Sequence, residues 1–291
     1  MKETICVAMS GGVDSSFVAA NFLNQGYRVI GITMQLFENQ TAHIDAKIVA
    51  DFLGIEHHVL DLREDFQSNV IKYFCDEYSK SRTPNPCVKC NERIKFGKLF
   101  DYAMNLGADY FATGHYARIE DGFLKKAEIL EKDQSYFLYR VDRDKLPRIK
   151  FPLGSFSKSE VRRQSELLKI PVAAKKDSQE ICFIPNDDYK KFLESRIEFK
   201  SGAIISTHGK FLGNHSGLAN FTIGQRRGIG IANSDPLYVV RLDAESNSVI
   251  VGANSDLFSK TLQARDLKFI VPVENQFRSN IKTRSGRRES M

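Results

Sequence analysis

The sequence predicts an α/β fold, a doubly wound parallel sheet, followed by a small β-rich second domain. Up to about residue 112, short apolar runs alternate with amphipathic segments, which is the pattern of βαβ units. After about residue 186, glycines and turn residues become dense between short alternating runs, which is typical of a small β domain. A chain of 291 residues is long enough for two domains.

Strands and helices alternate along the first part of the chain. The predicted strands are Thr4–Met9, Val29–Met34, His57–Leu60 and Tyr110–Ala112. The predicted helices are Ser15–Gln25, Ile44–Leu53, Phe66–Tyr78 and Asn91–Leu106. In Ile44–Leu53 the apolar residues recur at i, i+3, i+4 and i+7, so one helix face is apolar. Because ligands of doubly wound folds bind at the carboxyl ends of the strands, the loops that follow the strands are the candidate site.

The segment Ser10–Ser16 follows the first predicted strand and opens the first predicted helix. Its two glycines allow a sharp turn and a close approach of the backbone to a ligand. Hydroxyl and backbone N–H groups then meet at a helix N-terminus, where the helix dipole favours anions. No lysine follows the glycines, so this is not a Walker-type P-loop. We predict a phosphate site of another kind, with a plain helix cap as the alternative.

Composition narrows the class of protein. Hydrophobic residues make up 42% and charged residues 27% of the chain, which is ordinary for a globular protein. No run of about 20 apolar residues and no signal segment is present, so we expect a cytoplasmic location without a membrane. The net charge of +6 is compatible with a polyanionic partner. Five cysteines, an odd number, favour reactive or metal-binding thiols over a disulfide scaffold.

The segment Thr83–Asn91 is a second chemical signal, because Cys87 and Cys90 follow two prolines there. The prolines predict a rigid, non-helical loop, with Cys90 at the N-terminus of the next helix. That position, beside Lys89 and Arg93, lowers the pKa of a thiol and makes thiolate available. The alternative is half of a structural zinc site, which normally needs a second pair of ligands.

The third signal is Cys182, which stands in a charged and polar stretch that suits a functional thiol better than a core residue. Cys182 and Cys90 are far apart in the sequence. Two separated thiols over a nucleotide site suggest sulfur transfer, in which one carries a persulfide and the other attacks or resolves it. Cys6, inside the first strand, and Cys75, on the third helix, are predicted to be structural.

Together these segments resemble the tRNA-specific 2-thiouridylases, the bacterial MnmA family, which contain a PP-loop like that of the N-type ATP pyrophosphatases. The resemblance is carried by Ser10–Ser16, Asn85–Asn91, Thr113–Arg118, Lys132–Leu138, Lys176–Ile184 and Phe221–Gly228. It implies a PP-loop catalytic domain over residues 1–190, a small β-rich central domain over 191–255, and an incomplete C-terminal β-barrel over 256–291. We expect the first strand of that barrel at Leu267–Val273.

The resemblance implies binding sites for ATP, with Mg2+ on its phosphates, and for tRNA. The implied ATP-binding residues are Ala8, Met9, Ser10, Gly11, Gly12, Val13, Asp14, Ser15, Met34 and Gly114. The implied tRNA contacts are Asn85, Pro86, Cys87, His115, Asp133, Gln134, Ser135 and Arg284. The implied substrates are glutamate, lysine and glutamine tRNAs, whose wobble uridine (position 34) is adenylated at C2 with release of pyrophosphate.

The resemblance also implies the catalytic pair. Cys182 receives persulfide sulfur from a cysteine desulfurase or a sulfur-relay protein, and Cys90 releases the sulfur and ends in a Cys90–Cys182 disulfide. The products are 2-thiouridine and AMP. A variant stays open, in which Cys87, Cys90 and Cys182 hold a [4Fe-4S] cluster, although the persulfide route is favoured.

Two other functions stay open. A small-molecule ATP pyrophosphatase has no need of two distant cysteines. A truncated tRNA-binding homologue binds ATP but has impaired thiolation. In the second domain, Arg226 and Arg227 predict a basic loop for RNA phosphates, with a solvated turn as the alternative.

Overall fold

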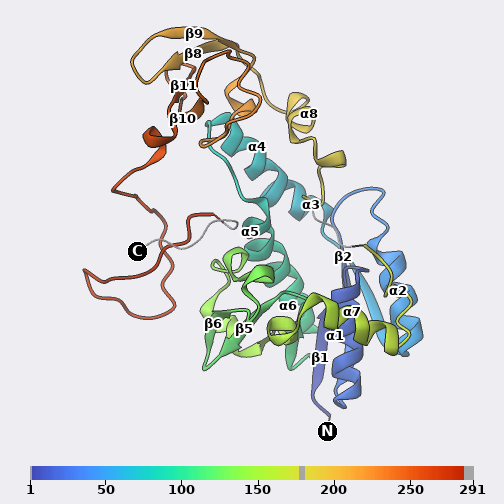
Figure 1. Ribbon diagram of the computed structural model, residues 1–291. Helices are drawn as coiled ribbons and strands as arrows, with labels where there is room; N and C mark the ends of the chain where they lie inside the picture. Colours follow the sequence, from blue (N-terminus) through green and yellow to red (C-terminus); the bar gives the residue numbers. More distant parts are fainter. Residues whose placement is uncertain (1, 177–180, 285–291) are drawn as a thin grey trace. The chain divides into compact units, whose positions relative to one another are not determined.

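The computed structural model describes residues 2–176 and 181–284, and the chain divides into two compact units (Figure 1). Unit 1 comprises Met1–Val70, Cys87–Gln179 and Lys268–Met291, and unit 2 comprises Ile71–Pro86 and Glu180–Leu267. The predicted domain boundaries at residues 190 and 255 stay predictions. The grouping of Ile71–Pro86 with the C-terminal half depends on tertiary contacts, which a linear division of the chain does not anticipate.

Unit 1 is built on a five-stranded sheet of order β3-β2-β1-β4-β7, in which every neighbouring pair is parallel. Its strands are β1 (Thr4–Ala8), β2 (Arg28–Gln35), β3 (Glu56–Asp61), β4 (Tyr110–Ala112) and β7 (Ile149–Lys150). The strand order reverses between β1 and β4, so the loops after these strands flank the crevice where doubly wound sheets bind ligands. The predicted fold class and its four strands are confirmed, while the two-residue β7 escaped prediction.

Alternate residues of the strands face opposite sides of this sheet. Ile5 and Val7 of β1 pack into one buried cluster, and Cys6 between them packs into the other. The first cluster lies under α1 (Val13–Asn24), α2 (Ala42–Leu53) and α7 (Lys158–Leu167). The second lies under the π-helical segment η2 (Asn91–Leu99) and α6 (Phe100–Asn105). Unit 1 therefore has three layers, with helices on both faces of the sheet (Figure 1).

The remaining helices correct one prediction. The third predicted helix consists of α3 (Arg63–Phe66), the π-helical η1 (Gln67–Ile71) and α4 (Lys72–Ser79). The fourth begins earlier than expected, at α5 (Pro86–Cys90), and continues into η2. The prediction of Cys90 at a helix N-terminus is therefore wrong. Proline at a first helical position has a suitable φ and loses no hydrogen bond, so Pro86 starts the helix.

Smaller elements complete unit 1 and lead into unit 2. A hairpin pairs β5 (Ala117–Glu120) with β6 (Phe123–Lys126). Short 3-10 turns lie at Leu130–Lys132, Ser135–Phe137, Arg143–Arg148, Pro152–Ser155, Pro185–Asp187, Leu218–Asn220 and Asn254–Leu257.

Among the residues described, no helix has both the length and the apolar composition of a membrane span.

Unit 2 contains a four-stranded sheet of order β10-β11-β8-β9, which confirms the predicted β-rich second part. Its elements are α8 (Tyr189–Glu194), β8 (Gly202–Ser206), β9 (Phe211–His215), β10 (Tyr238–Asp243) and β11 (Ser248–Gly252). Ile204, Val239, Val249 and Val251 form the centre of its core. These residues come from the three strands β8, β10 and β11. Pairing of these strands and formation of the unit 2 core therefore depend on each other.

The strand predicted at Leu267–Val273 is wrong, because these residues have no strand conformation. Their apolar side chains alternate but stay exposed, Leu267 by 62% and Val273 by 39%, and alternation alone does not supply a neighbouring strand. The segment from Lys268 instead lies along unit 1, where Lys268 pairs with Asp142 and donates to the Arg140 carbonyl oxygen (3.1 Å).

Gly11→Ala tests the turn between β1 and α1. Gly11 has φ +68°, and a Cβ there would lie 2.5 Å from the Ala42 carbonyl oxygen, whereas Gly54 has φ +65° and nothing within 4 Å. We expect Gly54→Ala to lower the free energy of unfolding by about 1–2 kcal/mol through backbone strain. Gly11→Ala adds a steric cost of about 1–3 kcal/mol. Urea denaturation measures both, and equal losses would contradict the tight approach of Gly11 to α2.

Candidate nucleotide and thiol site

The loop between β1 and α1 is shaped by its own hydroxyl groups. The Ser10 backbone N–H donates to Ser15 Oγ (3.0 Å), and Ser16 Oγ donates to the Gly12 carbonyl oxygen (2.8 Å). Gly12 is the N-cap of α1 and has no side chain to cap the first N–H groups of this helix. These N–H groups and the positive end of the helix dipole are the features that bind phosphate at helix N-termini.

The loop after β4 meets the first turn of α1 through Gly114. A Cβ atom on Gly114 would lie 3.1 Å from both Asp14 Cβ and the Ser15 backbone nitrogen. Glycine therefore allows two loops that are separated by about 100 residues in sequence to touch at the carboxyl edge of the sheet. The structure thus brings Gly114 next to the predicted phosphate loop.

Met34 lies near the end of β2, at the same edge of the sheet. The preceding Thr33 donates through Oγ1 to the Met9 carbonyl oxygen (2.8 Å) and lies 2.8 Å from His57 Nε2. These bonds hold the end of β1 against β2. Burial, with the charge of Lys47, lowers the pKa of His57, which favours a neutral imidazole beside Thr33.

Two lysines that sequence reasoning missed reach the phosphate loop. Lys158 Nζ donates to both carboxylate oxygens of Asp14, at 2.7 and 2.6 Å, and the Tyr116 hydroxyl donates to Asp14 Oδ1 (2.9 Å). Lys175 Nζ donates to the Gly11 carbonyl oxygen (3.0 Å). Asp14 is therefore held by a cation and a hydroxyl, and the Gly11 turn is held by a second cation.

A local signal for the element that carries Lys158 was present in the sequence. Ser157 precedes Lys158 and is followed three residues later by Glu160, which is the pattern of a helix start. In the structure, Ser157 Oγ accepts a hydrogen bond from the Glu160 backbone N–H (3.1 Å) and caps α7. The pattern predicts where the helix begins, but only the tertiary structure directs Lys158 toward Asp14.

Cys87 and Cys90 lie on one helical turn, because α5 spaces the two thiols by three residues. Cys90 is buried and Cys87 is exposed by its overall surface. Atoms around the Cys87 sulfur still desolvate it and raise the pKa of its thiol, and the charge of Lys95 opposes this effect. Asn85 and Pro86 directly precede this turn.

The charges expected to activate Cys90 are partly neutralised by Glu92. Glu92 accepts hydrogen bonds from Lys89 (2.9 Å) and from Arg140 (3.0 Å). Partial burial opposes ionisation of Glu92, but these bonds outweigh it and hold the pKa of the carboxyl below its usual value. Lys89 and the helix dipole therefore favour a Cys90 thiolate less than the sequence predicts, because Lys89 is paired with Glu92 and the helix begins at Pro86.

His115 occupies an aromatic pocket in unit 1. Its ring contacts those of Phe96 and Phe151, with ring centroids 5.8 and 5.9 Å away, and its Nδ1 lies 2.7 Å from Thr113 Oγ1. Burial, assisted by the charge of Lys95, holds the pKa of His115 well below 6.5. A neutral imidazole forms hydrogen bonds but supplies no charge for an RNA phosphate, so the predicted tRNA contact of His115 is of the uncharged kind.

The turn at residues 133–135, which we predict to contact tRNA, is held together by hydrogen bonds to the buried side chain of Asp133. Its side chain is only 2% exposed and accepts hydrogen bonds from the Ala127 N–H (3.0 Å) and from the N–H and hydroxyl of Ser135 (3.2 and 2.9 Å). Gln134 Oε1 accepts from the Tyr116 N–H (3.0 Å). These two side chains shape the turn, and the assignment of the turn to tRNA stays a prediction.

Two contacts connect this turn to other predicted site residues. The Asn91 side-chain amide, next to Cys90 in sequence, donates to the Phe137 carbonyl oxygen (2.9 Å). The Tyr136 hydroxyl donates to the Thr283 carbonyl oxygen (3.2 Å). Arg284 follows directly, and its charge opposes the rise that burial causes in the Tyr136 pKa. The cysteine helix, the turn and Arg284 therefore gather in unit 1.

Cys182 belongs to unit 2, where it is exposed. The neighbouring Phe183 is buried against Phe74 of α4 and Phe192 of α8, with ring centroids 5.4 and 5.3 Å away. This aromatic cluster fixes the backbone next to the thiol. Residues 177–180 of the same motif lie outside the described residues.

All five cysteines are free thiols. Burial raises the pKa of Cys6 to about 12, so this thiol is inert, as predicted for a structural residue. Cys90 and Cys182 belong to different units, and their pairing stays a prediction. Within the described ranges, no group of three or more His, Cys, Asp or Glu side chains is arranged to hold a metal ion. Cys87 and Cys90 belong to unit 1 and Cys182 to unit 2, so the [4Fe-4S] alternative stays a prediction.

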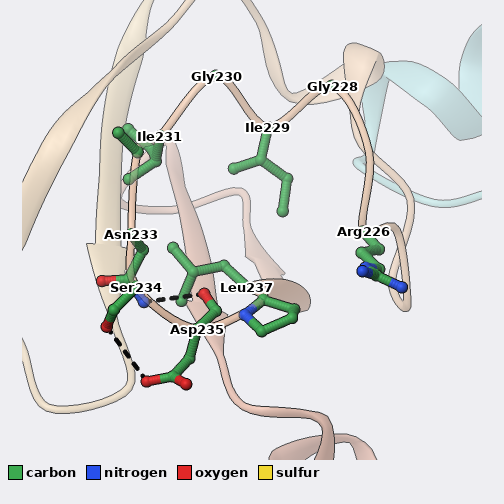
Figure 2. A pocket seen from close by; sticks show the side chains of 11 residues that line it. Arg226, Gly228, Ile229, Gly230, Ile231, Asn233, Ser234, Asp235 and Leu237 are labelled. Atoms are coloured by element: carbon green, nitrogen blue, oxygen red, sulfur yellow. Dashed lines mark hydrogen bonds between the residues drawn. The ribbon is translucent and has the colours of Figure 1, made fainter.

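Unit 2 has a pocket of about 540 Å³ next to the predicted basic loop. Figure 2 shows Ile229 and Leu237 directed toward the same space, with Arg226 at one end of the lining. On the opposite side, Asp235 accepts a hydrogen bond from the Ser234 hydroxyl (3.2 Å). Apolar, basic and acidic groups thus share this pocket, and the role of Arg226 toward RNA phosphates stays a prediction.

Comparison with known proteins gives a consistent result over nearly the whole chain. Residues 3–186 match the model of the tRNA methyl transferase HUP domain, and residues 190–253 match that of the tRNA methyl transferase PRC-barrel domain. A tRNA-specific 2-thiouridylase MnmA of Acetivibrio thermocellus is 44% identical, covering 99% of this chain and 87% of the relative. That of Pelobacter propionicus is 47% identical, over 96% of this chain and 83% of the relative. The chain belongs to the MnmA family.

The two family-model matches cover the β1–α1 loop, the cysteines at 87, 90 and 182, and the sheet of unit 2. The phosphate loop, Gly114, Cys87, Cys90 and Cys182 all lie within residues 3–186. The β8–β11 sheet of unit 2 lies within residues 190–253. The β1–α1 loop and the Gly114 loop, whose geometry is described above, therefore lie inside the range that matches the first family model.

An NMR titration of His115 tests the electrostatics of this MnmA-family site. We expect a neutral imidazole from pH 8 down to about pH 6, because burial holds the folded pKa well below the usual histidine value of about 6.5. The unfolded chain binds this proton near pH 6.5, so the contribution of His115 to stability is complete above that pH and decreases below it. A folded-state midpoint near 6.5 would contradict the buried setting; the urea-unfolded chain is the control.

Proposed function

We propose that this MnmA-family chain is a tRNA-uridine 2-sulfurtransferase, which converts the wobble uridine of tRNA into 2-thiouridine at the expense of ATP. The observation that carries the proposal is the similarity to 2-thiouridylases over nearly the whole chain. The phosphate loop and the cysteines 90 and 182 lie inside the matched range. A small-molecule ATP pyrophosphatase has no role for this cysteine pair, so we favour it less.

The first step is activation of uridine. The C2 oxygen attacks the α-phosphorus of ATP, the bond to the pyrophosphate oxygen breaks, and C2 acquires AMP as a leaving group. The N–H groups of the Gly11 turn and the first turn of α1 hold the phosphates, and the Gly114 loop borders the reacting end. Asp14 is the carboxylate placed to hold Mg2+, which supplies charge neutralisation on the phosphates when bound.

The second step is sulfur transfer. The terminal sulfur of a Cys182 persulfide, loaded by a cysteine desulfurase or a sulfur-relay protein, attacks C2 and AMP leaves. The Cys90 thiolate then attacks Cys182 Sγ, which releases the sulfur on uridine and forms a Cys90–Cys182 disulfide. An external dithiol reduces the disulfide for the next cycle. Glutamate, lysine and glutamine tRNAs are the proposed substrates.

A thiolation assay tests the function directly. The chain is mixed with ATP, Mg2+, cysteine, a cysteine desulfurase and glutamate tRNA, and the tRNA is separated on a gel that contains an organomercurial. We expect an ATP-dependent retarded band, because mercury binds thiolated tRNA and does not bind a methylated product. ATP binding without a retarded band would contradict the proposal and favour the tRNA-binding homologue with impaired thiolation.

Substitutions separate the two steps. We expect Cys182→Ser to lower thiolation by about 10³-fold or more, because the sulfur-carrying nucleophile is lost, while pyrophosphate release persists. Cys75→Ser is the matched control, since Cys75 is a half-buried thiol on α4. Thiolation by Cys182→Ser at the wild-type rate would exclude Cys182 from the mechanism.

Asp14→Ala tests the nucleotide site. We expect pyrophosphate release to fall by about 10²-fold, because the loop loses the carboxylate that is placed to hold Mg2+. Pyrophosphate is measured in single-turnover reactions with saturating tRNA. Wild-type release by this variant would contradict the assignment of the loop to ATP.

A further inference from the structure

Two lysine–aspartate pairs flank the phosphate loop. Lys158 is paired with Asp14, and Lys175 is paired with Asp45 (2.5 Å). The Lys158 side chain is only 16% exposed and the Asp14 side chain 29%, so this first pair is largely shielded from water. Ion pairs in such settings persist because each charge needs a partner when water is excluded.

The two pairs differ in what they hold. Lys175 also donates to the Gly11 carbonyl oxygen, so it fastens the backbone of the turn. Lys158 meets the loop through both oxygens of the Asp14 carboxylate, which is itself a candidate ligand for a divalent cation. Tyr116 holds Asp14 independently by its hydroxyl (2.9 Å), so Asp14 keeps one partner if Lys158 turns away.

We propose that Lys158 is a phosphate-binding residue of this site, whose ammonium leaves Asp14 for the pyrophosphate part of the nucleotide when a divalent cation occupies the Asp14 carboxylate. This inference rests on the proposed use of ATP. The flexible stem of lysine allows the ammonium to move between two anions without movement of α7. In the free protein, Asp14 holds the Lys158 ammonium in place and neutralises its charge. In the complex, the phosphates replace Asp14 as the partner of this ammonium.

The inference predicts the binding of a simple probe, magnesium pyrophosphate, measured by titration calorimetry on the full chain. We expect Lys158→Met to weaken binding by about 10- to 100-fold, the range for a lost hydrogen bond between charged groups. Lys158→Arg keeps the charge and should retain most of the affinity. Lys47→Met is the matched control, since Lys47 forms an exposed pair with Asp51 on α2.

A double-variant cycle separates phosphate binding from a purely structural role. If Lys158 only fastens α7 to α1 through Asp14, then Lys158→Met has no effect on pyrophosphate affinity once Asp14→Asn has removed the pair. If Lys158 binds phosphate, Lys158→Met weakens pyrophosphate binding in the Asp14→Asn background as well. Thermal melting of each variant verifies that it is folded. Unchanged affinity in that background would overturn the proposal.

The result is distinguishable from failure of the proposed function. A wild-type chain that binds magnesium pyrophosphate but never thiolates tRNA contradicts the sulfurtransferase proposal, while the cycle still decides the role of Lys158. A wild-type chain that binds neither ATP nor magnesium pyrophosphate overturns the phosphate site and the inference together.

Discussion

The site depends on one close approach, between the loop after β4 and the first turn of α1. The parallel sheet reverses its strand order between β1 and β4, so these loops flank the same crevice. This contact requires a residue without a side chain. Gly114 meets the requirement, since a Cβ there would lie 3.1 Å from Asp14 Cβ. The uncapped N–H groups of α1 are thereby bordered by a second loop, as in helix N-termini that bind anions.

Charged side chains around this contact are paired, and burial lowers the pKa values of His57 and His115. Asp14 is satisfied by Lys158 and Tyr116, and Glu92 by Lys89 and Arg140. Paired charges of this kind are able to exchange partners when an anion and a cation arrive together. The two lysines beside the loop, Lys158 and Lys175, are therefore each partnered by a carboxylate in this structure.

The cysteine helix shows how local and tertiary effects combine. Pro86 starts the helix four residues before Cys90, so the positive end of the helix dipole lies closer to Cys87 than to Cys90. Asn91 then ties this helix to the turn that contains Ser135, through the Phe137 carbonyl oxygen. The thiols and the predicted tRNA-binding turn are thus held in one unit by a hydrogen bond between residues 46 positions apart.

The sequence by itself determined the fold class, four of the five strands of the first sheet, and the positions of the β1–α1 loop and the cysteines, because periodicity and glycine patterns are local properties. Only the tertiary structure decided the partners of Asp14, the burial of Asp133 and the neutral state of His115. Lys158 reaches Asp14 across 144 positions, and no local pattern encodes such a contact. The same reason explains the wrong strand at Leu267–Val273, since a strand needs a neighbour that alternation cannot provide.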